Sequence, residues 1–133
     1  MTKYLIAYVA VLVAFVGIDM VWLMGVARST YVAEMGSLLR KQPNLLAAVM
    51  FYLLYTAGIL LFAVRPAVDA SSVMMALWLG AALGLVAYGT YDLTNLSVME
   101  GYGVKIAVID LAWGTLVTAL AAMIGAQVLK ALS

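Results

Sequence analysis

The stretch VMMALWLGAALGLVAYGTYDLTNLSV, residues 73–98, decides the fold, because it is long and apolar enough to cross a bilayer and yet contains an aspartate. A membrane-spanning helix needs about 20 mainly apolar residues. Asp92 lies in the last third of the stretch. A carboxyl group in hydrocarbon is costly, so it usually faces other helices and marks a working site or a structural polar contact. We therefore expect a transmembrane helix whose Asp92 face points into a bundle.

Three further segments have the length and composition of spanning helices, at residues 4–27, 45–64 and 106–129. The chain is 68% hydrophobic and 10% charged, with a mean hydropathy of +1.15. A water-soluble domain this apolar would have too little polar surface. The length of 133 residues suits a single domain, 1–133. These features predict an all-α bundle of four transmembrane helices, with the N and C termini on the same side.

The composition excludes several kinds of chemistry. The chain contains neither Cys nor His, which excludes disulfides, catalytic thiols, iron–sulfur clusters, His-ligated haem and ordinary zinc sites. A net charge of +1 argues against a nucleic-acid partner. Acid–base work falls to Asp, Glu, Lys or Tyr, and carboxylates can still bind a hard cation. The sequence indicates no particular cofactor and no defined metal site.

Polar residues within the spans gather in one half of the membrane. Asp19 lies late in the first span and Asp92 late in the third, whereas Asp110 lies early in the antiparallel fourth. The three carboxyl groups therefore share the half next to the first and third connections. Aromatic and amide side chains follow on the same helix faces at i, i+3 and i+4 spacing. The predicted intramembrane polar site comprises Asp19, Trp22, Tyr52, Tyr55, Tyr88, Tyr91, Asp92, Asn95, Asp110 and Trp113.

The first connection, residues 28–44, borders the same half. It supplies the basic residues Arg28, Arg40 and Lys41 at head-group level. Its apolar residues fall on one helical face, so part of it is expected to lie along the membrane interface. Buried carboxyl groups need compensation, which a proton, a hydroxyl or amide donor, a bound cation or an arginine from this connection could supply.

The polar cluster and its basic border favour a site that binds, or enzymatically modifies, a membrane lipid or another amphiphile. Intramembrane carboxyl groups also suit the transport of protons, cations or a small solute. A third interpretation is an accessory subunit of a membrane complex, in which the aspartates only fix helix register through hydrogen bonds. The sequence assigns neither a catalytic residue nor an enzyme class.

Two weaker signals concern packing and anchoring. Gly80 and Gly84 form a GxxxG motif, which allows helices to approach closely, either within the chain or between copies in a homo-oligomer. Tyr4 and Tyr102 stand at the ends of spans, where aromatic residues commonly anchor at the interface. Pro66 is expected to end the second span, because proline disrupts a helix interior.

Several stretches together resemble a known family. They are Asp19-Met-Val-Trp22; Gln42-Pro-Asn-Leu-Leu-Ala-Ala48, Phe51-Tyr-Leu-Leu-Tyr55 and Phe62-Ala-Val-Arg-Pro66; and Tyr88-Gly-Thr-Tyr-Asp-Leu-Thr-Asn95 with Asp110-Leu-Ala-Trp-Gly114. Together they resemble the predicted bacterial membrane proteins grouped as domain of unknown function 2177, over nearly the whole chain. The resemblance implies a multi-pass, four-helix protein of the bacterial inner (cytoplasmic) membrane. It implies no established activity, so no catalytic roles carry over.

Overall fold

The computed structural model describes all 133 residues, and its regular secondary structure is entirely helical, as the sequence predicts. Four helical segments are long and apolar enough to cross a membrane: Thr2–Val26, Leu45–Asp69, Val73–Val98 and Val104–Ala131. The first segment consists of α1 (Thr2–Val21) and the π-helical turn η1 (Trp22–Val26). The second consists of α3 (Leu45–Ile59), the π-helical turn η2 (Leu60–Val64) and α4 (Arg65–Asp69). The third and fourth are single helices, α5 (Val73–Val98) and α6 (Val104–Ala131). The short helix α2 (Arg28–Met35) lies in the first connection.

The predicted end of the second span at residue 64 is wrong, because helix continues to Asp69. Pro66 occupies the first turn of α4. The chain reaches Pro66 through the π-helical turn η2, in which the Arg65 N–H bonds to the carbonyl of Leu60 five residues earlier. This wider turn interrupts the regular α-helical bonding pattern in which a proline would clash. The turn η2 thus separates the hydrogen-bonding pattern of α3 from that of α4.

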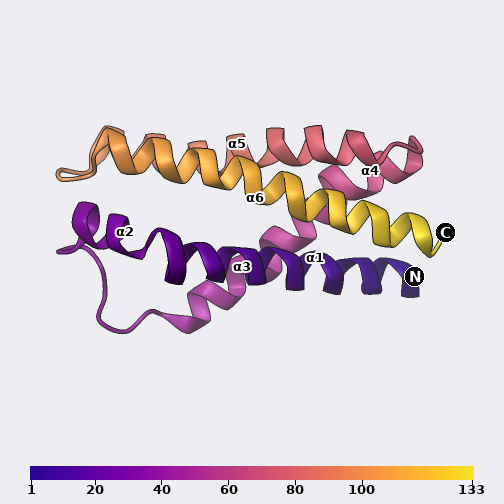
Figure 1. Cartoon of the computed structure of the whole chain (residues 1–133), viewed down its shortest axis with the longest axis horizontal. Helices are drawn as coiled ribbons and strands as arrows, with labels where there is room; N and C mark the ends of the chain where they lie inside the picture. Colours follow the sequence, from indigo (N-terminus) through magenta and orange to yellow (C-terminus); the bar gives the residue numbers. More distant parts are fainter.

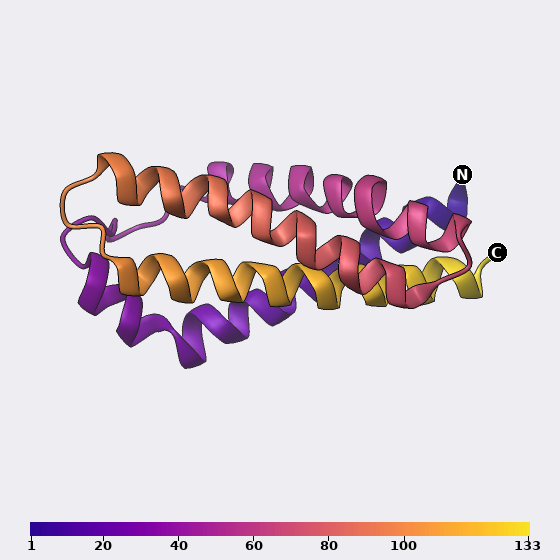
Figure 2. The same cartoon turned by 90° about the horizontal axis from the view of Figure 1, so that it is seen from above.

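The four long helices form two layers, with α5 and α6 in one and α1 and α3 in the other (Figure 1). α6 packs most extensively against α5 and also contacts α1, which crosses behind α6 in the turned view (Figure 2). Both chain ends lie at the same end of the bundle (Figure 1), where the Lys3 ammonium donates to the Ser133 hydroxyl at 3.4 Å.

Small residues explain the close contact between α5 and α6. A Cβ added at Gly80 would lie 2.7 Å from the Cβ of Ala122, and one added at Gly84 would collide with the Gly114 carbonyl. The GxxxG motif is therefore occupied by α6 of the same chain, the first of its two predicted uses. Association of copies through Gly80 and Gly84 stays a prediction, and it would require the second copy to take the place of α6.

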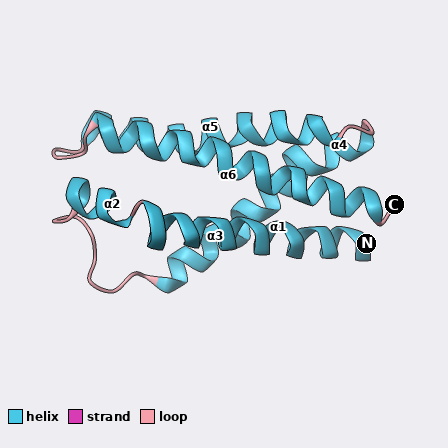
Figure 3. Ribbon diagram, in the orientation of Figure 1, coloured by secondary structure: helices cyan, strands magenta, loops and turns pink.

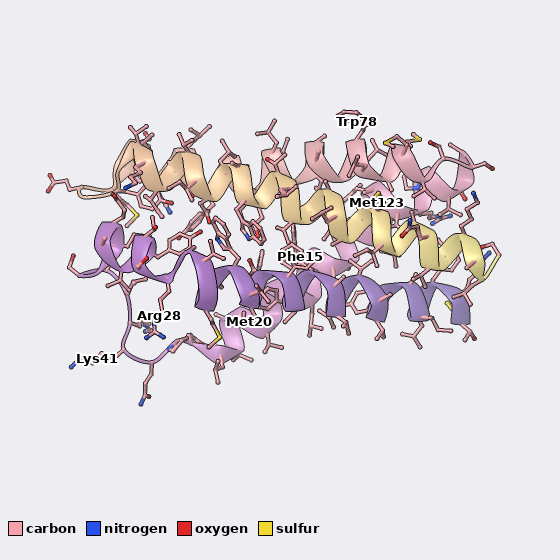
Figure 4. All side chains as sticks on the ribbon, in the orientation of Figure 1. Phe15, Met20, Arg28, Lys41, Trp78 and Met123 are labelled. Carbon is pink, nitrogen blue, oxygen red and sulfur yellow. The ribbon has the colours of Figure 1, made fainter.

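The two ends of the bundle are packed differently. Aliphatic side chains and Phe15 form the main core, and Phe15 points inward near its middle (Figure 4). At the other end the first half of α3 stands apart. None of its residues before Thr56 is buried, and the loop of residues 36–44 swings outward to reach it (Figure 3). The half of the bundle that holds the aspartates is therefore open between α3 and α5.

Candidate functional site

Asp92 of α5 points into the bundle and is fully buried. The hydroxyl of Tyr102 donates a hydrogen bond to Asp92 Oδ1 at 2.5 Å. The sequence predicted a hydroxyl, amide or cation partner inside the bundle, and the partner is the Tyr102 hydroxyl. The second oxygen, Oδ2, is buried and has no hydrogen-bond donor. The Asp110 carboxyl of α6, however, lies within hydrogen-bonding range of Asp92.

The expectation that Tyr102 anchors at the membrane interface is wrong, because its side chain is only 5% exposed. The connection between α5 and α6 turns at Gly101, whose φ of 83° lies in the left-handed region that favours glycine. This turn folds Tyr102 back beneath the helix ends, where it packs with Ile106 and Ala107. Burial, with Asp92 as the next cause, raises the pKa of Tyr102, so the phenol stays protonated and remains a donor.

Asp110 is held by the short helix α2. The Tyr31 hydroxyl donates to Asp110 Oδ1 at 2.7 Å, and the Trp22 indole N–H donates to the Tyr31 oxygen at 3.3 Å. Burial is the main cause that raises the pKa of Tyr31, and the nearby Asp110 carboxyl raises it further. Trp22 is the first residue of the π-helical turn η1, which directly precedes α2, and such turns often occur at functional sites. Hydrogen bonds thus run from Trp22 through Tyr31 to Asp110, and a separate hydrogen bond joins Tyr102 to the neighbouring Asp92.

Asp19 of α1 forms a separate but adjoining network. Its two carboxyl oxygens accept hydrogen bonds from the Tyr52 hydroxyl at 2.7 Å and from the Trp113 indole N–H at 2.9 Å. The rings of Trp22 and Trp113 stack with centroids 4.3 Å apart and planes 6° from parallel. This indole stack joins the Asp19 network to the Tyr31–Asp110 chain, although the three carboxyl groups do not meet at one point. No group of three or more acidic side chains is arranged to hold a metal ion.

The remaining predicted residues surround these networks. Tyr55 exchanges a hydrogen bond with the Thr118 hydroxyl at 2.8 Å, and its ring meets that of Tyr88 edge to face at 6.1 Å. Tyr91 is 54% exposed and lies at the rim. Asn95 lies beside Tyr91. The structure thus brings the aromatic residues close to the carboxyl groups, while Tyr91 and Asn95 stand at the edge.

Two cavities open beside the carboxyl pair. The first has a volume of about 740 Å³ and is lined by the predicted basic residues Arg28, Arg40 and Lys41, together with Tyr31, Tyr91, Tyr102 and Asp110. Arg28 and Lys41 lie on the side of the outward loop (Figure 4). The second has a volume of about 460 Å³ and is lined by Phe51, Ala87, Tyr88, Tyr91 and Asp110. Tyr91 and Asp110 line both cavities, so the two spaces adjoin.

Tyr31 and Tyr102 are the two site residues that sequence reasoning missed. Both lie in connections, outside the spans in which helical periodicity was used. For Tyr31 a signal was present, because it shares a helical face with Met35 in the first connection, next to the half that holds the aspartates. The position of Tyr102 depends on the turn at Gly101, and the sequence predicted a turn there but not the direction in which it sends the Tyr102 side chain.

Comparison with known proteins adds family membership. A family model described as "Predicted membrane protein (DUF2177)" matches residues 4–127, nearly the whole chain. The searches of curated proteins and of solved structures found no match. The family resemblance stated from the sequence motifs is thereby confirmed, and the chain belongs to the DUF2177 family of predicted membrane proteins.

Proposed function

We propose that this protein binds an amphiphile with an anionic head group in a bacterial inner membrane. The head group occupies the cavity of Arg28, Arg40 and Lys41, and the apolar part enters the aromatic cavity between α3 and α5. The observation that carries the proposal is that a basic cavity and an aromatic cavity adjoin at Tyr91 and Asp110. The first cavity presents three basic side chains within a partly hydrophobic lining, and the second is lined by aromatic and apolar side chains around Asp110, which suits the two ends of an amphiphile.

The basic cavity suits a phosphate or carboxylate group. Guanidinium groups bind such anions through two parallel N–H bonds, and an ammonium adds a compact charge. None of the three bases takes part in an ion pair, since the two ion pairs of the chain are Arg65–Asp69 and Lys105–Glu34. All three side chains are exposed. They are therefore free to neutralise a ligand at the level of lipid head groups.

The aromatic cavity suits an acyl chain. Phe51 is 43% exposed and Tyr91 54% exposed, so the rings at the entrance already face the membrane. α3 has few direct contacts with α5, which leaves a lateral path for an apolar chain from the bilayer. The volume of about 460 Å³ lies within the range of about 300–1,000 Å³ for small-molecule sites.

Native mass spectrometry tests the head-group contact directly. The protein in mild detergent is mixed with phosphatidylglycerol, which is anionic, or with phosphatidylcholine, which is zwitterionic. Wild type should retain phosphatidylglycerol preferentially, and the triple variant Arg28→Ala/Arg40→Ala/Lys41→Ala should lose that preference. The matched control, Lys3→Ala/Arg65→Ala/Lys130→Ala, removes the same amount of charge from the end of the bundle that holds the chain termini. This control should retain the preference for phosphatidylglycerol. Equal retention by both triple variants, or no retention by wild type, would refute the head-group assignment.

A second pair of variants tests the tail site. Ala87 lines the aromatic cavity, so Ala87→Phe should fill it and reduce phosphatidylglycerol retention several-fold. Ala82 lies on the same helix with its side chain exposed, so Ala82→Phe should bind lipid as wild type does. If both variants retain lipid equally, the acyl chain does not enter between α3 and α5.

The distribution of buried polar groups supports binding over transport. The buried polar residues are Asp19, Thr56, Asp92 and Thr118, and the core toward the chain ends is aliphatic apart from Phe15. A charge relay needs polar groups across both halves of the membrane. Proton flux into liposomes separates the two functions: flux through wild type that disappears in Asp92→Asn would favour transport.

A further inference from the structure

We propose that Asp92 and Asp110 form a proton-binding site in which two carboxyl groups share one proton. The occupancy of this site sets the charge that a ligand meets at Asp110. The pairing itself is independent of the proposed function. Only the link between the proton and ligand binding rests on the amphiphile site described above.

The hydrogen bonds around the pair leave room for one proton. Asp92 Oδ1 accepts from Tyr102, and Asp110 Oδ1 accepts from Tyr31. Asp92 Oδ2 is buried without a donor, and the two carboxyl groups lie within hydrogen-bonding range of each other. An ionised carboxylate only accepts hydrogen bonds, whereas a protonated one also donates. One shared proton therefore satisfies the buried oxygen that no other group reaches.

No cation takes the place of that proton. The groups closest to the pair are phenols, namely Tyr31 of α2, Tyr88 and Tyr91 of α5 and Tyr102 of the connection. Arg28, Arg40 and Lys41 line the first cavity together with Asp110, but none of them forms an ion pair with either carboxyl. Two further acidic residues lie near this region: Asp19 of α1 accepts hydrogen bonds from Tyr52 and Trp113, and Glu34 of α2 pairs with Lys105. The ion pairs of the chain involve neither Asp92 nor Asp110. Two adjacent carboxylates without a counterion in hydrocarbon would carry a large electrostatic cost, which one proton relieves.

The two members of the pair have different roles. Asp92 is fully buried and lines neither cavity, so it is a positioning residue that holds the proton against Asp110. Asp110 is half-buried and lines both cavities, so it is the member through which the proton exchanges. The Tyr31 hydroxyl of α2 covers Asp110 from the side of the basic cavity. Proton exchange is therefore confined to one end of the bundle.

Infrared spectroscopy of the purified protein tests the shared proton without any ligand. A protonated carboxyl group has a C=O stretching band that is separate from the carboxylate bands and shifts in D2O. Wild type at neutral pH should show this band, and Asp92→Asn should lose it because the second carboxyl group that shares the proton is gone. Asp69→Asn and Asp19→Asn should both keep it. Absence of the band from wild type, or its loss in Asp19→Asn with persistence in Asp92→Asn, would overturn the proposal.

The wild-type spectrum also covers the case in which the Asp92→Asn variant does not fold. If Asp92→Asn fails to fold, the wild-type band itself decides, because a proton shared by two carboxyl groups should persist at neutral pH, where exposed carboxyl groups are ionised. A band that is lost at the pH of an ordinary exposed carboxyl would contradict the proposal.

The link to the ligand has its own measurement. A negative head group beside Asp110 favours the protonated pair, so binding should take up a proton wherever the free pair is ionised. Over that pH range the affinity of wild type for phosphatidylglycerol should rise by up to about tenfold for each unit by which the pH is lowered. In Asp92→Asn this slope should flatten. A steep slope that is unchanged in Asp92→Asn would show that another group carries the linkage. Failure of lipid binding would leave the infrared band intact, so the two proposals can fail separately.

Discussion

The two halves of this bundle hold their helices together by different means. Toward the chain ends, small residues such as Gly125 let aliphatic side chains interlock, with Val11 and Val64 filling the space beside it. In the other half, hydrogen bonds to three aspartates join the helices around two cavities. Lipid provides little hydrophobic force between helices, so close packing and interhelical hydrogen bonds are the available alternatives. The closely packed half provides rigidity, and the hydrogen-bonded half provides space for a ligand.

The largest expected effect comes from disturbing the close contact between α5 and α6. Gly84→Leu should destabilise the protein by about 3 kcal/mol or more, because its side chain would collide with α6 backbone that cannot move aside. The measurement is unfolding by SDS in mixed micelles. Gly17→Leu is the matched control, since a Cβ there meets nothing within 4 Å. Equal stability of the two variants would show that the packing of α5 on α6 does not determine stability.

The next largest effect concerns the buried hydrogen bond between Tyr102 and Asp92. Tyr102→Phe removes the donor to Asp92 and should cost about 1–3 kcal/mol, because a buried acceptor is left unsatisfied. The double variant Asp92→Leu/Tyr102→Phe removes both partners and should recover that stability or exceed the wild type, as apolar replacements of buried charges often do. Additive losses in the same SDS titration would argue against this coupling.

A smaller and more local effect is expected at α2. Tyr31→Phe removes the hydrogen bond that ties α2 to Asp110 and should cost about 1 kcal/mol. Hydrogen exchange should rise at residues 28–35 and stay unchanged in the middle of α6. Unchanged exchange at residues 28–35 would mean that apolar contacts, rather than the Tyr31 hydroxyl, hold α2 in place.

The smallest effect lies where the two halves meet. Tyr55→Phe loses one hydrogen bond to Thr118 and should cost about 0.6 kcal/mol, the average for an interhelical hydrogen bond in a membrane protein. Thr118→Val should cost a similar amount, and the double variant little more than either single variant. A loss several times larger would place Tyr55 within the packed half of the molecule.

Hydropathy was sufficient to predict the spans, because the bilayer requires long apolar helices whatever their packing. The i, i+3, i+4 spacing around Asp92 also predicted which face of α5 turns inward. Spacing within one helix could not predict the partners, since these depend on how separate helices rotate against each other. Asp92 therefore pairs with Asp110, and Asp19 has Tyr52 and Trp113 instead. Pro66 was misread because its effect depends on where the first turn of α4 begins.

The stacked indoles of Trp22 and Trp113 give the site an optical signature. Parallel aromatic rings in contact couple their electronic transitions, so the pair should give a near-ultraviolet circular dichroism signal that separated indoles lack. The third tryptophan, Trp78, is 68% exposed on the outer face of α5 and reports on the surrounding lipid instead. Opening of the site by a ligand, or release of α2, can therefore be followed in real time on the unlabelled protein.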